Sequence, residues 1–130
     1  PVEYVEGRNF TAGAPQSIIT GVRPGQIVTR KEEEGYGAIR AIDPRTGEKK
    51  WDFKMTDVTD SGVLTTGSDL VFAGGREGYF FALDARTGNL LWRMPLGGVV
   101  ASGPISYMVN GKQYVSVNAG SGMFVFALKQ

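Results

Sequence analysis

The sequence contains neither cysteine nor histidine among its 130 residues. Without cysteine it can form no disulfide bond and offers no thiolate for catalysis or for a zinc site. Without histidine it has no imidazole base and no imidazole metal ligand. Any metal or acid–base chemistry must therefore use Asp, Glu, Lys, Tyr or the backbone.

An excess of charge of either sign is also missing. The chain carries 14 basic and 13 acidic side chains, which are interspersed and give a formal net charge of +1. This balance provides no electrostatic footprint for nucleic acid or for an anionic membrane. The longest wholly apolar run, residues 123–128, is far shorter than the roughly 20 residues of a membrane-spanning helix. We therefore predict no nucleic-acid partner and no membrane span.

Glycine is abundant, at 19 of 130 residues, and 42% of the residues are hydrophobic. Average glycine usage is about 7%, so the composition indicates a loop-rich chain that can still bury a core. The length suits one domain. Because the sequence begins Pro1-Val2-Glu3, without Met or an apolar leader, we expect a processed product or a piece of something longer.

A repeat occupies the middle of the sequence, between residues 41 and 92. The pattern A-x-D-x-R-T-G-x-x-x-W occurs twice, and the two copies align without gaps at an offset of 41 positions. The matched residues are Ala41 and Ala82, Asp43 and Asp84, Gly47 and Gly88, and Trp51 and Trp92. A third copy begins at residues 124–128, where Phe-Val-Phe-Ala-Leu resembles residues 80–83.

Each copy reads as a strand, a tight turn and a second strand. The residues before the Asp are aliphatic and aromatic, as in strands. The Asp can accept backbone N–H bonds in the turn, and the Gly supplies a left-handed residue. Upstream of the second copy, residues 63–66 and 70–73 are expected to be two more short strands. Four antiparallel strands in about 41 residues correspond to one blade of a β-propeller.

The predicted fold is all-β, a partial β-propeller of about two and a half to three four-stranded antiparallel blades, without a helix. We divide residues 1–130 into an incomplete first blade with a loop insertion (1–56), a complete blade (57–97) and an incomplete last blade (98–130). The first part is expected to hold strands within 3–10 and 26–30 around a Gly/Pro-rich insertion at 13–25. In the last blade, Asn110-Gly111 is a strong hairpin signal. A closed propeller needs four or more blades, so we expect an oligomer or another chain to complete the ring.

The repeat resembles the tryptophan-docking motif of the quinoprotein dehydrogenases, eight-bladed propellers that use pyrroloquinoline quinone (PQQ). The series Gly62-Val63-Leu64-Thr65-Thr66, then residues 70–74, 104–107 and 111–115, is similar in order and spacing to the carboxyl-terminal third of that family. The resemblance covers about residues 35–128. It implies that each Trp lies in the seam between blades, against a turn Gly of the neighbouring repeat, with its indole N–H bonded to a backbone carbonyl. Trp51 and Trp92 are then structural, and Asp43 and Asp84 are turn residues.

The resemblance also implies where a site would lie. In that family the catalytic Asp, the metal-binding Glu and Asn, a Cys pair and an Arg over the quinone come from earlier blades, and those motifs are absent here. We therefore expect no catalytic and no metal-binding residue in this chain. Two loops correspond to segments that approach the cofactor, one with Asp60 and Ser61 and one with Gly120 and Ser121. Many members carry Trp where Asp60 stands, and both loops can also be read as ordinary connections between strands.

Two functions remain open. In the first, the chain is part of a periplasmic PQQ-dependent dehydrogenase that oxidises alcohols or related substrates, with Ca²⁺ or a lanthanide polarising the quinone while hydride passes to it. Here the chain supplies blade scaffold and part of the cofactor floor. In the second, it is a non-catalytic propeller module for protein binding or assembly, similar to the outer-membrane assembly lipoprotein with the same repeat.

Overall fold

The computed structural model describes residues 2–4, 22–24, 36–57 and 59–127. The chain divides into two units, Pro1–Lys31 and Glu32–Gln130. In the first unit, β1 (Val2–Tyr4) pairs antiparallel with β2 (Val22–Pro24). Strand β2 falls inside the stretch 13–25 that the sequence predicted as a loop insertion, so that prediction was wrong at this point. A proline is tolerated in the edge strand of a short ribbon such as this one. The predicted strand at 26–30 lies outside the described residues.

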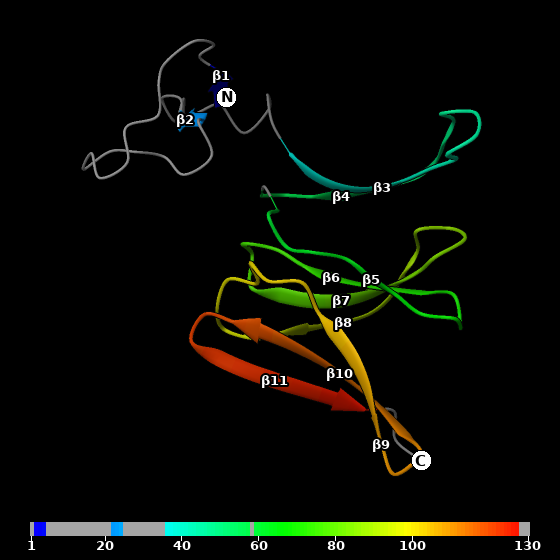
Figure 1. The fold of residues 1–130 in the computed structure, drawn as a ribbon, viewed down its shortest axis with the longest axis vertical. Helices are drawn as coiled ribbons and strands as arrows, with labels where there is room; N and C mark the ends of the chain where they lie inside the picture. The colour runs from blue at the N-terminus through cyan, green and yellow to red at the C-terminus, as the bar shows by residue number, and fades with distance from the viewer. Residues whose placement is uncertain (1, 5–21, 25–35, 58, 128–130) are drawn as a thin grey trace. The chain divides into compact units, whose positions relative to one another are not determined.

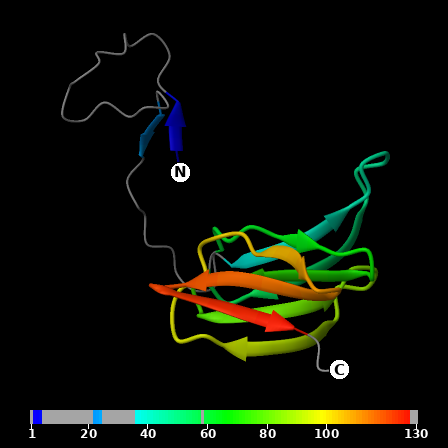
Figure 2. The same cartoon turned by 60° about the horizontal axis from the view of Figure 1, so that its bottom comes forward.

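The second unit contains three antiparallel sheets (Figures 1 and 2). They have two, four and three strands, in the orders β3-β4, β5-β6-β7-β8 and β9-β10-β11. The strands are β3 (Gly37–Ile42), β4 (Lys49–Met55), β5 (Leu64–Thr65), β6 (Leu70–Gly74), β7 (Tyr79–Asp84), β8 (Leu90–Pro95), β9 (Ile105–Val109), β10 (Lys112–Ala119) and β11 (Gly122–Ala127). The turn between β9 and β10 has positive φ at both Asn110 and Gly111, as the Asn-Gly signal predicted.

The sheets stack face to face, with two apolar clusters between them (Figure 1). We call the cluster between the β3–β4 sheet and the β5–β8 sheet the first seam. Its buried members are Ile39, Met55, Val71, Ala73, Phe81 and Leu83. We call the cluster between the β5–β8 and β9–β11 sheets the second seam. Its buried members are Phe80, Val100, Val115, Val117 and Ala119.

Strand β7 joins both seams. Successive side chains of a strand point to opposite faces of the sheet, so Phe80 enters the second seam while Phe81 and Leu83 enter the first. Both faces of β7 are covered, which explains why Phe-Phe-Ala-Leu is a continuous apolar run and not an alternating one. Phe80 and Leu83 have no exposed surface.

Antiparallel sheets stacked in this way, each built from consecutive strands, are the blades of a propeller. The predicted all-β partial β-propeller is therefore confirmed, and the described residues include no helix. In that part of the chain, no helix is long and apolar enough to cross a membrane.

The up-and-down order of the strands also sets where the connections meet. The connection into β5, the β6–β7 turn and the connection out of β8 lie at one end of the four-stranded sheet, because alternate strands run in opposite directions. The repeated Asp-x-Arg-Thr-Gly turns lie at the opposite end. We call the first of these ends the loop end.

Candidate functional site

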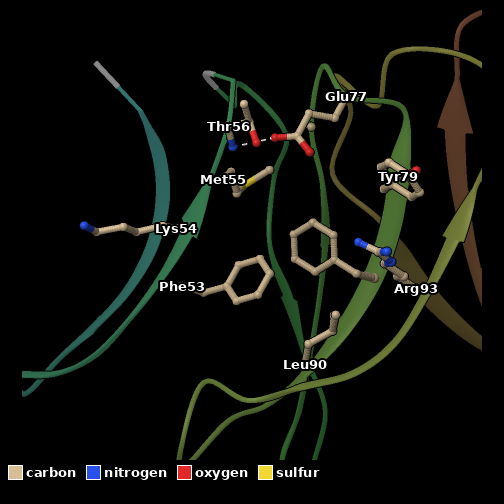
Figure 3. Close-up of a pocket in the computed structure, with 10 residues that line it drawn as sticks. Phe53, Lys54, Met55, Thr56, Glu77, Tyr79, Leu90 and Arg93 are labelled. Carbon is tan, nitrogen blue, oxygen red and sulfur yellow. Dashed lines mark hydrogen bonds between the residues drawn. The ribbon is translucent and has the colours of Figure 1, made fainter. Parts of the chain in front are cut away.

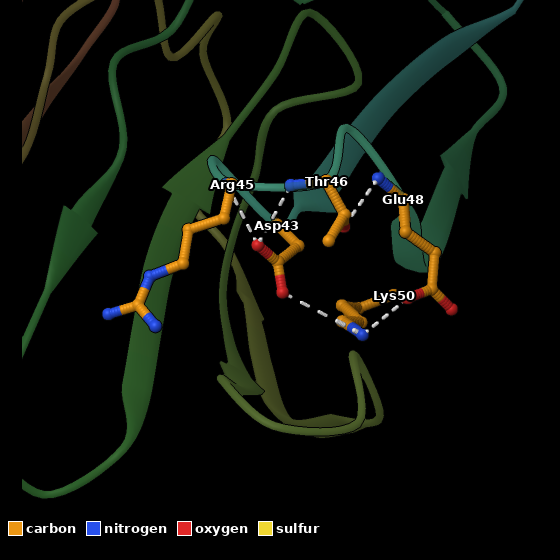
Figure 4. A network of polar contacts seen from close by, with 5 residues as sticks. All are labelled: Asp43, Arg45, Thr46, Glu48 and Lys50. Atoms are coloured by element: carbon orange, nitrogen blue, oxygen red, sulfur yellow. Dashed lines mark hydrogen bonds and ion pairs between the residues drawn. The ribbon is translucent and has the colours of Figure 1, made fainter.

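The two Asp-x-Arg-Thr-Gly turns have the same hydrogen bonds. In the first turn, Oδ1 of Asp43 accepts the main-chain N–H of Arg45 at 2.9 Å and of Thr46 at 3.4 Å (Figure 4). In the second, Oδ1 of Asp84 accepts those of Arg86 at 2.8 Å and Thr87 at 2.9 Å. These are Asx-type turns, in which a side chain replaces a backbone acceptor. The carboxylates thus organise the turns.

Glycine closes each of these turns. Gly47 and Gly88 have φ of 73° and 74°, and each donates its N–H to the carbonyl of the turn Asp at 2.8 Å. Residues other than glycine rarely adopt this left-handed backbone conformation. The two glycines nevertheless differ in their surroundings, because Gly47 is exposed and Gly88 is buried.

Trp51 covers Gly88 across the first seam. A Cβ added to Gly88 would lie 2.7 Å from the Trp51 ring, so the indole rests directly on the glycine backbone. The indole Nε1–H donates to the carbonyl of Ala85 at 2.9 Å. A large ring with one polar atom therefore connects β4 to the turn of the next sheet. The seam contacts of Trp51 have the form that the resemblance implies.

Trp92 has a different environment. It is 36% exposed and makes edge-on contacts with Phe80 and Phe126, with ring centroids 6.1 and 5.3 Å apart. No hydrogen bond of its indole N–H occurs within the described residues. The second copy of the motif thus places its Trp at the rim of the second seam.

We expect Trp51→Phe to lower the free energy of unfolding by about 0.5–1.5 kcal/mol, the net value of a typical hydrogen bond. The phenyl ring keeps most of the apolar contact with Gly88 but leaves the Ala85 carbonyl without its donor. Urea unfolding followed by circular dichroism measures the change. Trp92→Phe is the matched control and should cost less; equal costs for the two variants would contradict a role for the indole N–H.

The turn at Asp84 makes stability dependent on pH. The main-chain N–H groups of Thr87 and Arg86 hold the pKa of Asp84 below its ordinary value. A carboxyl group whose pKa is lower in the folded than in the unfolded protein stabilises the fold above its unfolded pKa, about 3.9, and loses that effect as pH falls through the folded-state pKa. Melting temperatures between about pH 6 and pH 3 should therefore fall more steeply for the wild type than for Asp84→Asn. Parallel curves would exclude this contribution.

At the loop end, Asp60 and Ser61 lie in the connection between β4 and β5. Oδ2 of Asp60 pairs with the Arg76 guanidinium at 3.2 Å, and this hydrogen bond holds the pKa of Asp60 below its ordinary value. The Ser61 hydroxyl lies 3.1 Å from the carbonyls of both Gly62 and Ser102 and can donate to either. Asp60 is thus held at the surface by a charge pair.

Gly120 and Ser121 form the turn between β10 and β11. Gly120 has φ of 56° and donates its N–H to the Val99 carbonyl at 2.9 Å; Ser121 is exposed. Both predicted pairs therefore border the connection between β8 and β9, one through Ser102 and the other through Val99. No described contact joins the two pairs directly.

Glycines let the backbones approach closely at the loop end. A Cβ on Gly62 would lie 2.7 Å from the Cα of Gly103, and one on Gly98 would lie 2.9 Å from the Gly120 nitrogen. The surface here is formed mainly by main chain and small side chains. It can offer N–H and carbonyl groups to a flat ligand, together with the remaining N–H donors of the Arg76 guanidinium, whose charge is paired with Asp60.

A hollow of about 190 Å³ opens beside the first seam (Figure 3). Its floor contains Phe53 and Phe81, whose rings lie 5.1 Å apart, and Arg93 stacks over Tyr79 at 5.1 Å. Glu77 borders the hollow and bonds Thr56. None of the predicted site residues lines this hollow.

Acidic clusters are not present in the described ranges: among those residues no three acidic side chains come together to hold a metal ion. Thr59, Arg76 and Glu77 at the loop end were not predicted from the sequence. Glu77 precedes Gly78 in the β6–β7 turn and reads as an ordinary turn residue. Its partners, Thr56 and Asp57, are about twenty positions away in the sequence, and no local sequence pattern indicates such a contact.

The chain matches a family model described as outer membrane protein assembly factor BamB over residues 35–129. It is 39% identical over 119 residues to a quinoprotein ethanol dehydrogenase from Pseudomonas putida, covering 92% of this chain and 18% of that protein.

Two solved structures are also similar. The quinohemoprotein alcohol dehydrogenase from Comamonas testosteroni has a TM-score of 0.63 and 38% identity, covering 68% of this chain and 13% of that one. A europium-containing methanol dehydrogenase has a TM-score of 0.62 and 33% identity, covering 66% and 15%. The chain thus spans less than a fifth of the length of each of these proteins.

Proposed function

Since this chain belongs to the propeller family whose model is described as outer membrane protein assembly factor BamB, and its relatives include quinoprotein dehydrogenases, we propose that it forms part of a PQQ-dependent alcohol dehydrogenase. In this proposal the chain is a carboxyl-terminal segment of the propeller. It supplies blade scaffold and part of the floor beneath the cofactor.

The observation that carries the proposal is the arrangement of the loop end. The connections with Asp60 and Ser61 and with Gly120 and Ser121 both border the β8–β9 connection, on the same side of the molecule. Rigid sheets that hold several loops at one end are a common basis for ligand sites. The Trp51 contact supports the proposal as well, because it fixes one blade against the next.

The residues at the loop end fit PQQ as a floor. PQQ is a flat ring system with carboxylates, and the loop end offers glycine backbone, the Ser61 hydroxyl and the Arg76 guanidinium. When bound, PQQ supplies the redox chemistry, accepting the hydride equivalent of the alcohol. The residues of this chain would position the cofactor and exclude water beneath it.

A metal does not fit the described part of this chain, since no three acidic side chains converge there. We propose that Ca²⁺ or a lanthanide is held by other parts of the propeller, as is the catalytic base. The europium of the similar methanol dehydrogenase is consistent with a metal in proteins of this kind. No catalytic step is assigned to a residue of this chain.

We further propose a periplasmic location, a small-molecule alcohol as substrate, and a ring completed by other blades or by further copies of the chain. The division into parts at 1–56, 57–97 and 98–130 remains a proposal too. A second candidate function, a non-catalytic module for protein assembly, is favoured by the description of the matching family model. Large apolar side chains exposed on β9, such as Ile105 and Met108, could contact a protein partner in that case.

A chimera distinguishes these functions. Residues 35–129 replace the similar segment of the Comamonas testosteroni quinohemoprotein alcohol dehydrogenase, and the purified protein is titrated with PQQ in the presence of Ca²⁺. We expect quinone uptake and alcohol-dependent dye reduction within about tenfold of the parent, a loss of about 1.4 kcal/mol or less. A folded chimera that takes up no quinone would contradict the proposed function and favour the assembly module.

The polypeptide by itself gives a complementary result. Mixed with PQQ, Ca²⁺ and short alcohols, it should reduce no dye, because the catalytic groups are placed elsewhere. Turnover by this polypeptide alone would contradict the proposal that the catalytic groups lie in other parts of the propeller.

A further inference from the structure

Glu77 lies in the β6–β7 turn and binds the backbone of a different connection. Its Oε1 atom accepts the main-chain N–H of Thr56 at 2.6 Å and that of Asp57 at 3.0 Å (Figure 3). Hydrogen bonds to an ionised carboxylate are stronger than those between neutral groups. One oxygen atom therefore fixes two consecutive peptide groups directly after β4.

The rest of this connection is attached to the same turn. The Thr59 hydroxyl donates to the Gly74 carbonyl at 2.9 Å and accepts the Ser61 N–H at 3.2 Å. Asp60 pairs with Arg76, the neighbour of Glu77. Residues 74–77 thus hold the segment 56–62 at its beginning and near its end.

Side-chain anchors matter here because the segment has no strand partner. Its described residues, 56–57 and 59–62, belong to no sheet, so strand pairing does not hold their backbone in place. Close packing against β3 further limits the backbone positions that this segment can adopt. A Cβ on Gly37 would lie 2.1 Å from the Asp57 carbonyl oxygen, which shows how tightly the backbone of β3 approaches this segment.

We propose that Glu77 is the positioning residue of the quinone floor: by holding the N–H groups of Thr56 and Asp57, its carboxylate sets the course of the segment that carries Asp60 and Ser61. The inference rests on the proposed function for its consequence, and on the geometry above for the anchor itself. Glu77 acts through the backbone and does not contact the cofactor.

Amide hydrogen exchange in this polypeptide tests the anchor. In Glu77→Ala, exchange at Thr56 and Asp57 should accelerate by at least about tenfold, while exchange at Phe81 in β7 stays unchanged. Glu77→Gln keeps the Oε1 acceptor and should restore most of the protection. Glu48→Ala, which alters an exposed glutamate in the turn between β3 and β4, is the matched control. Unchanged exchange in Glu77→Ala would overturn the anchor.

Quinone affinity in the chimera tests the consequence. Glu77→Ala should weaken PQQ binding by about tenfold, a change of about 1.4 kcal/mol, and Glu77→Gln should bind like the unsubstituted chimera. Equal affinity in all three proteins would overturn the positioning role while leaving the proposed function intact. An unsubstituted chimera that binds no PQQ would instead overturn the proposed function, and with it the role of Glu77 in a quinone floor.

Discussion

Replacing Gly88 by alanine should destabilise the protein by about 2–5 kcal/mol. Two costs add at this position. The left-handed backbone costs a residue with a Cβ about 1–2 kcal/mol, and forcing a methyl group into a packed site costs about 1–3 kcal/mol. The added Cβ would lie 2.7 Å from two ring atoms of Trp51, so the indole must leave its place in the first seam.

Gly47 provides a matched control for this substitution. It has nearly the same φ, 73° against 74°, in the same turn, but nothing lies within 4 Å of an added Cβ. Gly47→Ala should therefore show only the backbone cost of about 1–2 kcal/mol. Urea unfolding of both variants measures the difference, and equal losses would mean that the contact between Trp51 and Gly88 contributes nothing.

Replacing Phe80 by alanine should cost about 3–5 kcal/mol, the range observed for buried aromatic residues. Phe80 has no exposed surface and lies between the rings of Phe72 and Phe126, with centroids 5.8 and 5.5 Å away. Its loss would leave a cavity at the centre of the second seam. Because domains are stable by only about 5–15 kcal/mol, the variant should be close to unfolding.

Tyr36→Ala is the control for Phe80→Ala. Tyr36 is 49% exposed, so its removal should cost far less than that of Phe80. Thermal unfolding followed by circular dichroism compares the two variants with the wild type. A loss of less than about 1 kcal/mol for Phe80→Ala would show that the sheets are not held together through this ring.

The repeat made most of the fold predictable from sequence. Turn residues such as Asp84 and Gly88 act within a few positions of one another, so their spacing alone indicates the turn. The expected strands at 63–66 and 70–73 correspond to β5 and β6, with shifts of one residue at their ends. The apolar run at residues 80–83 indicated a strand. The structure shows in addition that both faces of this strand, β7, are covered by neighbouring sheets.

The two copies of the repeat have different surroundings, which the shared motif does not indicate. Arg40 occupies the repeat position of Phe81, and Asp52 that of Arg93. Phe81 is buried in the first seam, whereas Arg40 is exposed and pairs with Asp52 at 3.2 Å. A face covered by a neighbouring sheet selects apolar side chains, and an open face permits charged ones.

The loop end was the least predictable part. Asp60 and Ser61 could be named from the resemblance, but their partners Arg76 and Ser102 are brought to them by the stacking of strands distant in sequence. Glu77 carries no local signal either, because its acceptor role depends on where β4 ends. Contacts of this kind follow from tertiary structure and not from periodicity.

A crystal structure of the chimera with PQQ bound would show where the cofactor lies relative to this chain. We predict that the quinone ring lies in van der Waals contact, within about 4 Å, with the main chain at Asp60 and Ser61. A structure in which the bound quinone touches neither Asp60–Ser61 nor Gly120–Ser121 would contradict the assignment of this chain to the cofactor floor.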